Sequence, residues 1–374
     1  MFEEKQMIVY GKKLTQIPPE LCSVADYEKR AKELIAPDIW EYIDSGAGDD
    51  ISRNKNLLSY NDIQIWNRVL RDVSQGHTRC KLNGLELPHP IILGPVAHQK
   101  LVDPAGEIAT AQAASATDTL MVTSTLASHT LEEIAENSSQ YRWFQLYWQN
   151  DREQSLALLR RAEKLAYKAI VITVDVPING LRRRIQRADF SLPQDAAAIN
   201  IQNANMPLAI AEGQSEIFQG WMSTAPTWED IAWLISETTL PVYIKGILHP
   251  DDAEQAAKAG ATGIIISNHG GRALDGVPSP LTVLPLIRKA IGNDIPLLID
   301  GGIRQGSDVF KAIAFGANAV CLGRPQFYGL AVAGALGVAH IIKLLRQELE
   351  VTMALAGCAT LTDINSSCIF QGNN

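Results

Sequence analysis

From residue 91 onward, short apolar runs rich in β-branched residues alternate with longer stretches whose apolar positions recur at helical spacing. The short runs predict strands buried on both faces, as in a parallel sheet. There are eight of them, at residues 91–93, 120–123, 143–146, 169–174, 242–244, 263–266, 296–299 and 319–322. Helical stretches follow most of them, at 104–116, 131–136, 152–166, 251–259, 284–291, 308–315 and about 332–353. Eight such units over roughly 250 residues predict an α/β fold of the (β/α)8 type, a TIM barrel.

A doubly wound sheet is the alternative arrangement of alternating strands and helices. It is disfavoured because no GxGxxG fingerprint follows the first strand. The connection between the fourth and fifth strands, residues 191–226, is long and rich in Gln and Asn, which is typical of an active-site lid. Ahead of the barrel, residues 1–23 are interpreted as a polar arm. Residues 24–374 are interpreted as one barrel domain that begins with a helical segment.

Composition excludes several classes of protein. The chain has 374 residues and a net charge of −8, and its one dense basic run is residues 182–184, which argues against a nucleic-acid partner. The five cysteines are widely spaced and form no CxxC pattern, so neither a disulfide framework nor a metal site is expected. A reducing compartment fits best.

The sequence also bears on location. The first residues are charged where a secretion signal would need a basic start and an apolar core. The longest apolar stretch, residues 330–339, is too short and too rich in glycine to cross a bilayer. We therefore expect a cytoplasmic protein without an integral membrane segment.

Candidate chemistry gathers directly after the sixth strand, where His269 and Arg272 flank two glycines. In a parallel barrel, the carboxyl ends of the strands carry the active site. An imidazole can take up a proton near neutral pH, and a guanidinium can bind a carboxylate through two hydrogen bonds. The pair therefore predicts proton abstraction beside a bound carboxylate. The alternative, a core histidine beside a surface arginine, is less favoured because the glycines allow close approach of a ligand.

The other strand ends carry groups that suit a flat heterocycle and an anion. Hydrogen-bonding groups follow strands two to five, and a backbone-dominated corner at residues 94–97 follows strand one. Residues 300–306 and 323–324 follow strands seven and eight, where TIM barrels recurrently bind phosphate. A phosphorylated substrate, a flavin or pyridoxal phosphate would each satisfy this pattern.

Four sequence runs resemble the FMN-dependent 2-hydroxy acid oxidases and dehydrogenases, which include glycolate oxidase and L-lactate oxidase. They are Trp-Phe-Gln-Leu-Tyr at 143–147, Ser-Asn-His-Gly-Gly-Arg at 267–272, Asp-Gly-Gly-Ile-Arg at 300–304 and Leu-Gly-Arg-Pro at 322–325. The resemblance extends from about residue 24 to the end. It implies that FMN is bound by Pro95, Val96, Ala97, Ser124, Gln145, Thr173, Lys245, Ser267, Asp300, Gly301, Gly302, Arg304, Gly323 and Arg324. It implies that a small 2-hydroxy acid is bound by Tyr42, Tyr147, Arg182, His269, Arg272, Val96 and Leu126.

The resemblance also implies roles. His269 would be the general base, with Asp175 holding its second nitrogen, and Lys245 would favour the anionic reduced flavin. Whether the base removes the hydroxyl proton during hydride transfer, or the α-proton to give a carbanion, stays open. The catalytic residues implied are His269, Asp175, Tyr147 and Tyr42.

Departures from the glycolate oxidase pattern bear on specificity. Leu126 replaces a usual tryptophan and Val96 a usual threonine, which predicts L-lactate or a longer alkyl acid as substrate. Glycolate and aromatic hydroxy acids remain alternatives. The basic run leaves open whether Arg182 or Arg183 binds the carboxylate. Ala97 matches the oxidases, so O2 is the expected acceptor, giving a 2-oxo acid and H2O2. A dehydrogenase that passes electrons to a quinone or another carrier is the alternative, and the family suggests a homotetramer.

Overall fold

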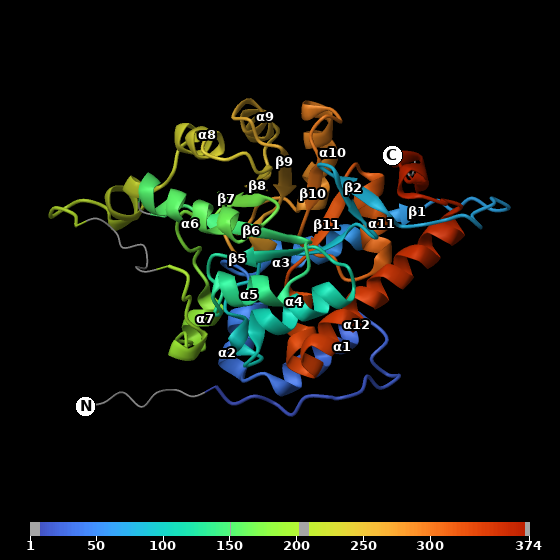
Figure 1. Ribbon diagram of the computed structural model, residues 1–374, viewed down its shortest axis with the longest axis horizontal. Helices are drawn as coiled ribbons and strands as arrows, with labels where there is room; N and C mark the ends of the chain where they lie inside the picture. The colour runs from blue at the N-terminus through green and yellow to red at the C-terminus, as the bar shows by residue number, and fades with distance from the viewer. Residues whose placement is uncertain (1–7, 150, 202–208, 371–374) are drawn as a thin grey trace.

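The computed structural model describes residues 8–149, 151–201 and 209–370. Eight parallel strands form a closed barrel surrounded by helices (Figure 1). The barrel closes where the last strand pairs with the first, through Val320–Leu322 beside Ile91–Leu93. This confirms the predicted TIM barrel, and each of the eight predicted runs coincides with a strand. The strands are β4 (Ile91–Leu93), β5 (Met121–Ser124), β6 (Arg142–Tyr147), β7 (Ile170–Thr173), β8 (Val242–Ile247), β9 (Gly263–Ile266), β10 (Leu297–Ile299) and β11 (Ala319–Leu322).

Seven of the outer helices correspond to the predicted ones, and one was missed. The missed helix, α8, begins with a capping box between Thr227 and Asp230, a sequence signal that could have revealed it. The last helix begins at Arg324 rather than near residue 332, because Pro325 suits its first turn and the backbone bends at Ala333 and Gly334. The helices are α4 (Gly106–Ala116), α5 (Leu131–Asn137), α6 (Arg152–Lys164), α8 (Trp228–Ser236), α9 (Pro250–Lys258), α10 (Pro280–Ile291), α11 (Gly306–Ala314) and α12 (Arg324–Ala356).

The barrel interior is packed at the amino ends of its strands. Trp143 and Tyr243 meet there with ring centroids 4.5 Å apart. A hairpin of β2 (Cys80–Leu82) and β3 (Leu85–Leu87), absent from the sequence prediction, covers this end, and Asn83 Nδ2 donates to the Tyr243 hydroxyl at 2.7 Å. With this end closed, only the carboxyl ends of the strands can open into a site.

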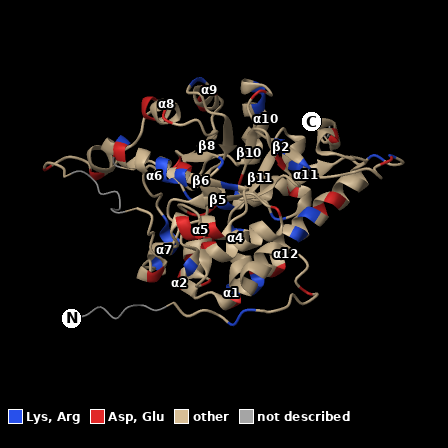
Figure 2. Cartoon of the chain, viewed as in Figure 1, with Lys and Arg blue, Asp and Glu red and all other residues tan. Residues whose placement is uncertain are grey.

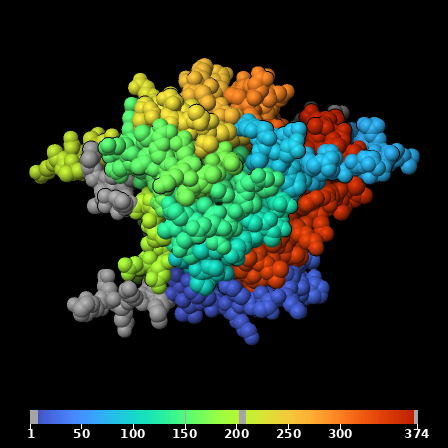
Figure 3. Space-filling model, in the orientation of Figure 1, coloured from blue at the N-terminus to red at the C-terminus, as the bar shows by residue number. Residues whose placement is uncertain are grey.

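The amino-terminal helical segment expected from the sequence is present as α1 (Val24–Leu34), α2 (Pro37–Asp44) and α3 (Ile51–Asn61). The described part of the arm before it runs below α1 and the amino-terminal end of α12, as Figures 1 and 3 show. Lys13 Nζ donates to Leu330 O at 2.6 Å and pairs with Asp103 at 2.8 Å. Residues 1–7 of the predicted arm lie outside the described residues, and its boundary at residue 23 stays a prediction.

The long connection after β7 contains short helical turns. They are α7 (Arg183–Arg187), η2 (Gln194–Ala196), a π-helical turn at Glu216–Gly220 and η4 (Trp221–Thr224). The buried Asn200 side chain accepts from Leu131 N at 3.0 Å and donates to His129 O at 2.8 Å. The first part of the connection is therefore fixed to the loop after β5. Residues 202–208 lie outside the described residues, and a lid motion stays a prediction.

Charge and hydropathy patterns agree with this arrangement. Acidic and basic residues are interspersed on the outer helices, including the exposed end of α12 (Figure 2). Within the described part of the chain, α12 is long and apolar enough to cross a membrane by length and composition, but 67% of its most apolar window is buried in the protein. Its apolar character is thus accounted for by packing against α1, α4 and α11.

The packed end of the barrel gives a prediction about Gly263. A β-carbon at this position would lie 2.1 Å from the Tyr243 ring, so Gly263→Ala should lower the free energy of unfolding by about 1–3 kcal/mol or more. Chemical denaturation of the purified variant measures this. In a Tyr243→Leu background the same alanine should cost clearly less, because the ring is gone. An equal cost in both backgrounds would contradict the steric explanation.

Candidate active site

The carboxyl ends of the strands open into a cavity of about 1150 Å³, large enough for a cofactor and a small acid together. Most of the site residues predicted from the sequence line it. Three lie directly behind the wall, where Gln145 contacts Ser124, Asp175 contacts His269 and Ser267 contacts Lys245. The predicted residues in the wall are Tyr42, Pro95, Val96, Ala97, Ser124, Leu126, Tyr147, Thr173, Arg182, Lys245, His269, Arg272, Asp300, Gly301, Gly302, Arg304, Gly323 and Arg324.

His269 and Asp175 form the central pair. His269 Nδ1 lies 2.9 Å from Asp175 Oδ1, and His269 Nε2 lies 3.4 Å from the Tyr147 hydroxyl. Burial lowers the pKa of His269, although Asp175 opposes that change. Burial works against the Asp175 carboxylate, but His269 and Lys245 outweigh it and lower the pKa of Asp175. A neutral imidazole that donates from Nδ1 to the carboxylate keeps Nε2 available as a base.

The turn that carries His269 has an unusual backbone. Residues His269, Gly270 and Gly271 have φ angles of 58°, 64° and 77°. Asn268 Oδ1 accepts from Gly271 N at 3.0 Å, and the amide groups of Asn56 and Asn268 exchange two hydrogen bonds of 2.8 Å. Sequence reasoning missed Asn56, since nothing local links a residue on α3 to a turn 212 positions later.

Lys245 is a buried cation in the cavity wall. Its Nζ donates to Ser267 Oγ at 2.9 Å and pairs with Asp300 Oδ2 at 3.1 Å. Burial opposes its charge, but Asp300 and Asp175 outweigh burial and raise the pKa of Lys245. The side chain therefore stays positive and can stabilise negative charge on a bound ring.

Two arginines offer a carboxylate site. The Arg272 guanidinium lies 5.2 Å from the centre of the Tyr42 ring and donates to Tyr42 O at 2.7 Å. Burial, together with the neighbouring Arg182, lowers the pKa of Arg272 to about 9, which leaves it charged at neutral pH. Arg182 faces the cavity, whereas Arg183 is bonded to Asp49 at 2.6 Å on the exposed side. Of the two candidates in the basic run, Arg182 has the geometry to bind the carboxylate.

The loops after β10 and β11 form the end predicted to hold phosphate. Gly301 and Gly302 have φ angles of 87° and 90°, and a β-carbon on Gly302 would lie 2.0 Å from Asn56 O. A β-carbon on Gly323 would meet nothing within 4 Å, so the backbone there borders open space. Arg324 donates to Gly270 O at 3.0 Å, and burial lowers its pKa to about 10. Glycine backbone and two guanidinium groups, from Arg304 and Arg324, suit an anionic phosphate.

Several buried polar atoms around the cavity have no protein partner. They belong to groups that can hydrogen-bond the edge of a heterocycle or a phosphate, and each unsatisfied group costs about 1–3 kcal/mol. Within the described part of the chain, the atoms without a hydrogen-bond partner include Gln145 Nε2, Thr173 Oγ1 and Asp300 Oδ1. Arg304 Nε also lacks a hydrogen bond, although it lies 3.7 Å from Glu28 Oε2. The donor and acceptor set therefore fits FMN, with its polar ring edge and its terminal phosphate. No group of His, Cys, Asp and Glu that could hold a metal occurs within that same part of the chain.

A TIM barrel with a histidine–carboxylate pair, two arginines and glycine-rich loops suited to a phosphate has the features expected of a flavin-dependent oxidoreductase. Residues 31–371 match the family model for FMN-dependent dehydrogenase, and the chain belongs to that family. This confirms the resemblance seen in the sequence motifs and FMN as the cofactor.

Relatives with curated names cover nearly the whole chain. An L-lactate oxidase of Alicycliphilus denitrificans is 50% identical over 351 residues, covering 93% of this chain and 96% of the relative. Glycolate oxidase 3 of Arabidopsis thaliana is 39% identical, covering 94% and 96%. Among solved structures, a mandelate oxidase with (S)-2-phenylpropionate superposes with a TM-score of 0.84 at 39% identity, covering 91% of this chain and 96% of that one.

The His269–Asp175 pair predicts the pH dependence of turnover. The base must be neutral, so kcat/KM for a 2-hydroxy acid should be lost only as the pH falls through the lowered pKa of His269, below the ordinary value of about 6.5. Removing the carboxylate charge with Asp175→Asn should shift this limb to still lower pH. It should also reduce kcat by about 10³–10⁴-fold by allowing the wrong tautomer. An acid limb at or above pH 6.5 in the wild type would contradict the assignment of His269 as the base. An unchanged flavin spectrum in Asp175→Asn serves as the control for folding.

Proposed function

We propose that the protein oxidises L-lactate, or a 2-hydroxy acid with a longer alkyl side chain, to the 2-oxo acid and reduces O2 to H2O2. The observation that carries the proposal is the convergence of His269, Arg182 and Arg272 on one cavity whose wall also contains the apolar Val96 and Leu126. Relatives named L-lactate oxidase, at 44% to 50% identity, support it.

The proposed binding mode follows from the charges. Arg182 and Arg272 neutralise the substrate carboxylate, and the Tyr42 phenol adds a hydrogen bond. Burial raises the pKa of Tyr147 to about 12, so its hydroxyl stays protonated and can donate to the substrate hydroxyl oxygen. These contacts hold the α-carbon in one orientation before reaction.

The proposed chemistry uses His269 as the base. Bound FMN supplies the two-electron oxidant. His269 Nε2 takes the proton that leaves the substrate, and Asp175 stabilises the imidazolium through Nδ1. Lys245, held by Asp300, would place its positive charge next to the flavin ring, which gains electron density during the reaction.

The side-chain end of the pocket supports an alkyl substrate. Phe190 stacks on Tyr42 with ring centroids 4.8 Å apart, and Trp221 and Met222 of the long connection continue the apolar wall. With leucine at 126 in place of tryptophan, the wall leaves room for more than a hydrogen on the α-carbon. The same room makes an aromatic hydroxy acid the second candidate, which the mandelate oxidase structures favour.

Acceptor, location and assembly are part of the proposal. O2 is favoured over a quinone or a soluble carrier because Ala97 matches the oxidases. A cytoplasmic location agrees with five free cysteines, Cys22, Cys80, Cys321, Cys358 and Cys368. A homotetramer rests on the family resemblance.

An anaerobic visible spectrum tests the function directly. The purified yellow protein is mixed with L-lactate, L-2-hydroxybutanoate, glycolate or L-mandelate and then opened to air. Bleaching by the alkyl acids and fast return of colour with formation of H2O2 is the expected result. Slow return of the yellow colour would indicate that the acceptor is not O2. If none of the acids bleached the flavin, the proposal would be overturned.

Leu126 gives a prediction about specificity. Leu126→Trp should fill the space next to the α-carbon, reducing kcat/KM for L-lactate and L-2-hydroxybutanoate by about 10-fold or more while sparing glycolate. Val96→Thr is the matched control, because it changes polarity at nearly constant volume. Steady-state kinetics with the three acids distinguish the two variants, and equal losses for all acids in Leu126→Trp would count against a steric pocket.

A further inference from the structure

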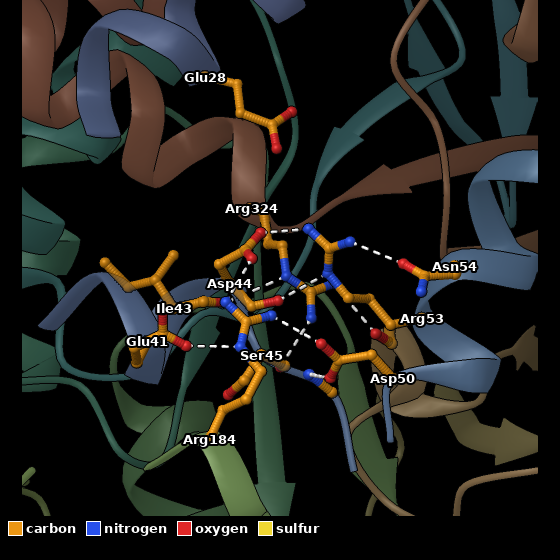
Figure 4. A network of polar contacts seen from close by, with 12 residues as sticks. Glu28, Glu41, Ile43, Asp44, Ser45, Asp50, Arg53, Asn54, Arg184 and Arg324 are labelled. Atoms are coloured by element: carbon orange, nitrogen blue, oxygen red, sulfur yellow. Dashed lines mark hydrogen bonds and ion pairs between the residues drawn. The ribbon is translucent and has the colours of Figure 1, made fainter. Parts of the chain in front are cut away.

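Arg184, two residues after Arg182, is the centre of a cluster of ion pairs (Figure 4). Its Nε donates to Glu41 Oε2 at 2.5 Å, and its two terminal nitrogens pair with Asp50 Oδ2 at 2.7 Å and Asp44 Oδ2 at 3.0 Å. Asp44 is buried and also pairs with Arg53. All three acidic partners belong to the segment that ends α2 and begins α3.

The same segment holds the second substrate arginine. Arg272 donates through one nitrogen to Tyr42 O at 2.7 Å and to Ile43 O at 3.0 Å, both at the end of α2. Tyr42 itself supplies the phenol proposed to bind the carboxylate. The position of Arg272 relative to the substrate is therefore fixed by residues 42–43.

The backbone around Arg182 approaches the same place. Gly48 N donates to Leu181 O at 2.7 Å, and a β-carbon on Gly180 would lie 2.0 Å from Ala273 O. These contacts bring the chain close to Arg272, but they end before Arg182. On the other side of Arg182, α7 has no buried residue. Arg184 makes three ion pairs to the α2–α3 segment and Arg183 one, and Phe190 beyond the helix stacks on Tyr42.

We propose that Arg184 is a positioning residue. Its bonds to Glu41, Asp44 and Asp50 hold the neighbouring Arg182 at the place where it can bind the substrate carboxylate together with Arg272 and Tyr42. The inference rests on the proposed function, in which Arg182 binds the substrate carboxylate. Arg184 does not line the cavity, so its effect on the substrate is indirect. Three acceptors fixed on one segment set the direction of a planar guanidinium more tightly than one surface ion pair can.

Arg183 provides a matched control in the next position. It carries the same charge on the same short helix, but it pairs only with the exposed Asp49. An isolated exposed pair contributes about 0–1 kcal/mol, so Arg183→Met removes the charge without removing the attachment.

The experiment measures anaerobic reduction of the FMN enzyme by L-lactate in a stopped-flow instrument. Arg184→Met should raise the apparent dissociation constant for L-lactate about tenfold or more, with a limiting reduction rate within about threefold of wild type. Arg183→Met should leave both values near wild type. Arg184→Lys, which keeps the charge but not the planar geometry, should give an intermediate affinity.

A double-mutant cycle separates positioning from a general effect of charge or stability. In an Arg182→Met background, Arg184→Met should weaken L-lactate binding little further, because the group it positions is absent. The proposal is overturned if the loss is the same in both backgrounds, or if Arg184→Met behaves like Arg183→Met. FMN content, measured on the same samples, should be similar in the two single variants, and thermal unfolding should show that both are folded at the assay temperature.

A variant that fails to fold and a wild type that is not reduced by any 2-hydroxy acid have different meanings for the proposal. If Arg184→Met does not fold, Glu41→Gln removes the negative charge of one partly exposed acceptor. This variant must weaken L-lactate binding without slowing the limiting reduction rate for the proposal to stand. If wild-type FMN enzyme is not reduced by any 2-hydroxy acid, the proposed function fails. Normal reduction of the wild type with no selective effect in either arginine variant refutes the positioning role alone.

Discussion

The site depends on one backbone constraint, the left-handed turn from His269 to Gly271. A non-glycine residue at positive φ costs about 1–2 kcal/mol, so the turn persists only where its surroundings fix it. The fixing groups come from outside the barrel. The Asn56–Asn268 amide pair joins α3 to the turn, and a β-carbon on Gly271 would lie 2.4 Å from Arg53 N. His269, the proposed base, is therefore oriented by α3 as much as by the strand that precedes it.

A second constraint is the concentration of positive charge in a buried place. The guanidinium groups of Arg272 and Arg324 lie close together, because both donate to Ile43 O and Ser45 O at the carboxyl end of α2. Carbonyls at the end of a helix lack intrahelical partners and carry the negative end of the helix dipole. One short helix thus supplies acceptors to two guanidinium groups and leaves their remaining donors for anionic ligands. Burial lowers the pKa of both arginines, and neighbouring arginines lower it further.

The features of the fold and the site that depend on local sequence patterns are predicted correctly from the sequence. All eight barrel strands and the cavity positions of His269 and Arg272 follow from short apolar runs and the residues after them, because a parallel barrel brings every strand's carboxyl end to one rim. What it does not predict depends on long-range contacts. The partnership of Asn56 with Asn268 and the hairpin that closes the barrel through Asn83 have no local signature. The choice between Arg182 and Arg183 was likewise open, because it depends on where a short helix meets α2.

The two halves of the site are supported by different parts of the fold. Gln145, Thr173 and Lys245 belong to barrel strands, whose mutual hydrogen bonds fix their positions. Tyr42 belongs to α2, and Arg182 and Phe190 belong to the connection after β7. These two segments are joined to each other by ring stacking and ion pairs. We therefore expect substitutions in α2 or in the connection to alter the proposed substrate binding without disturbing the strand residues proposed to hold the flavin.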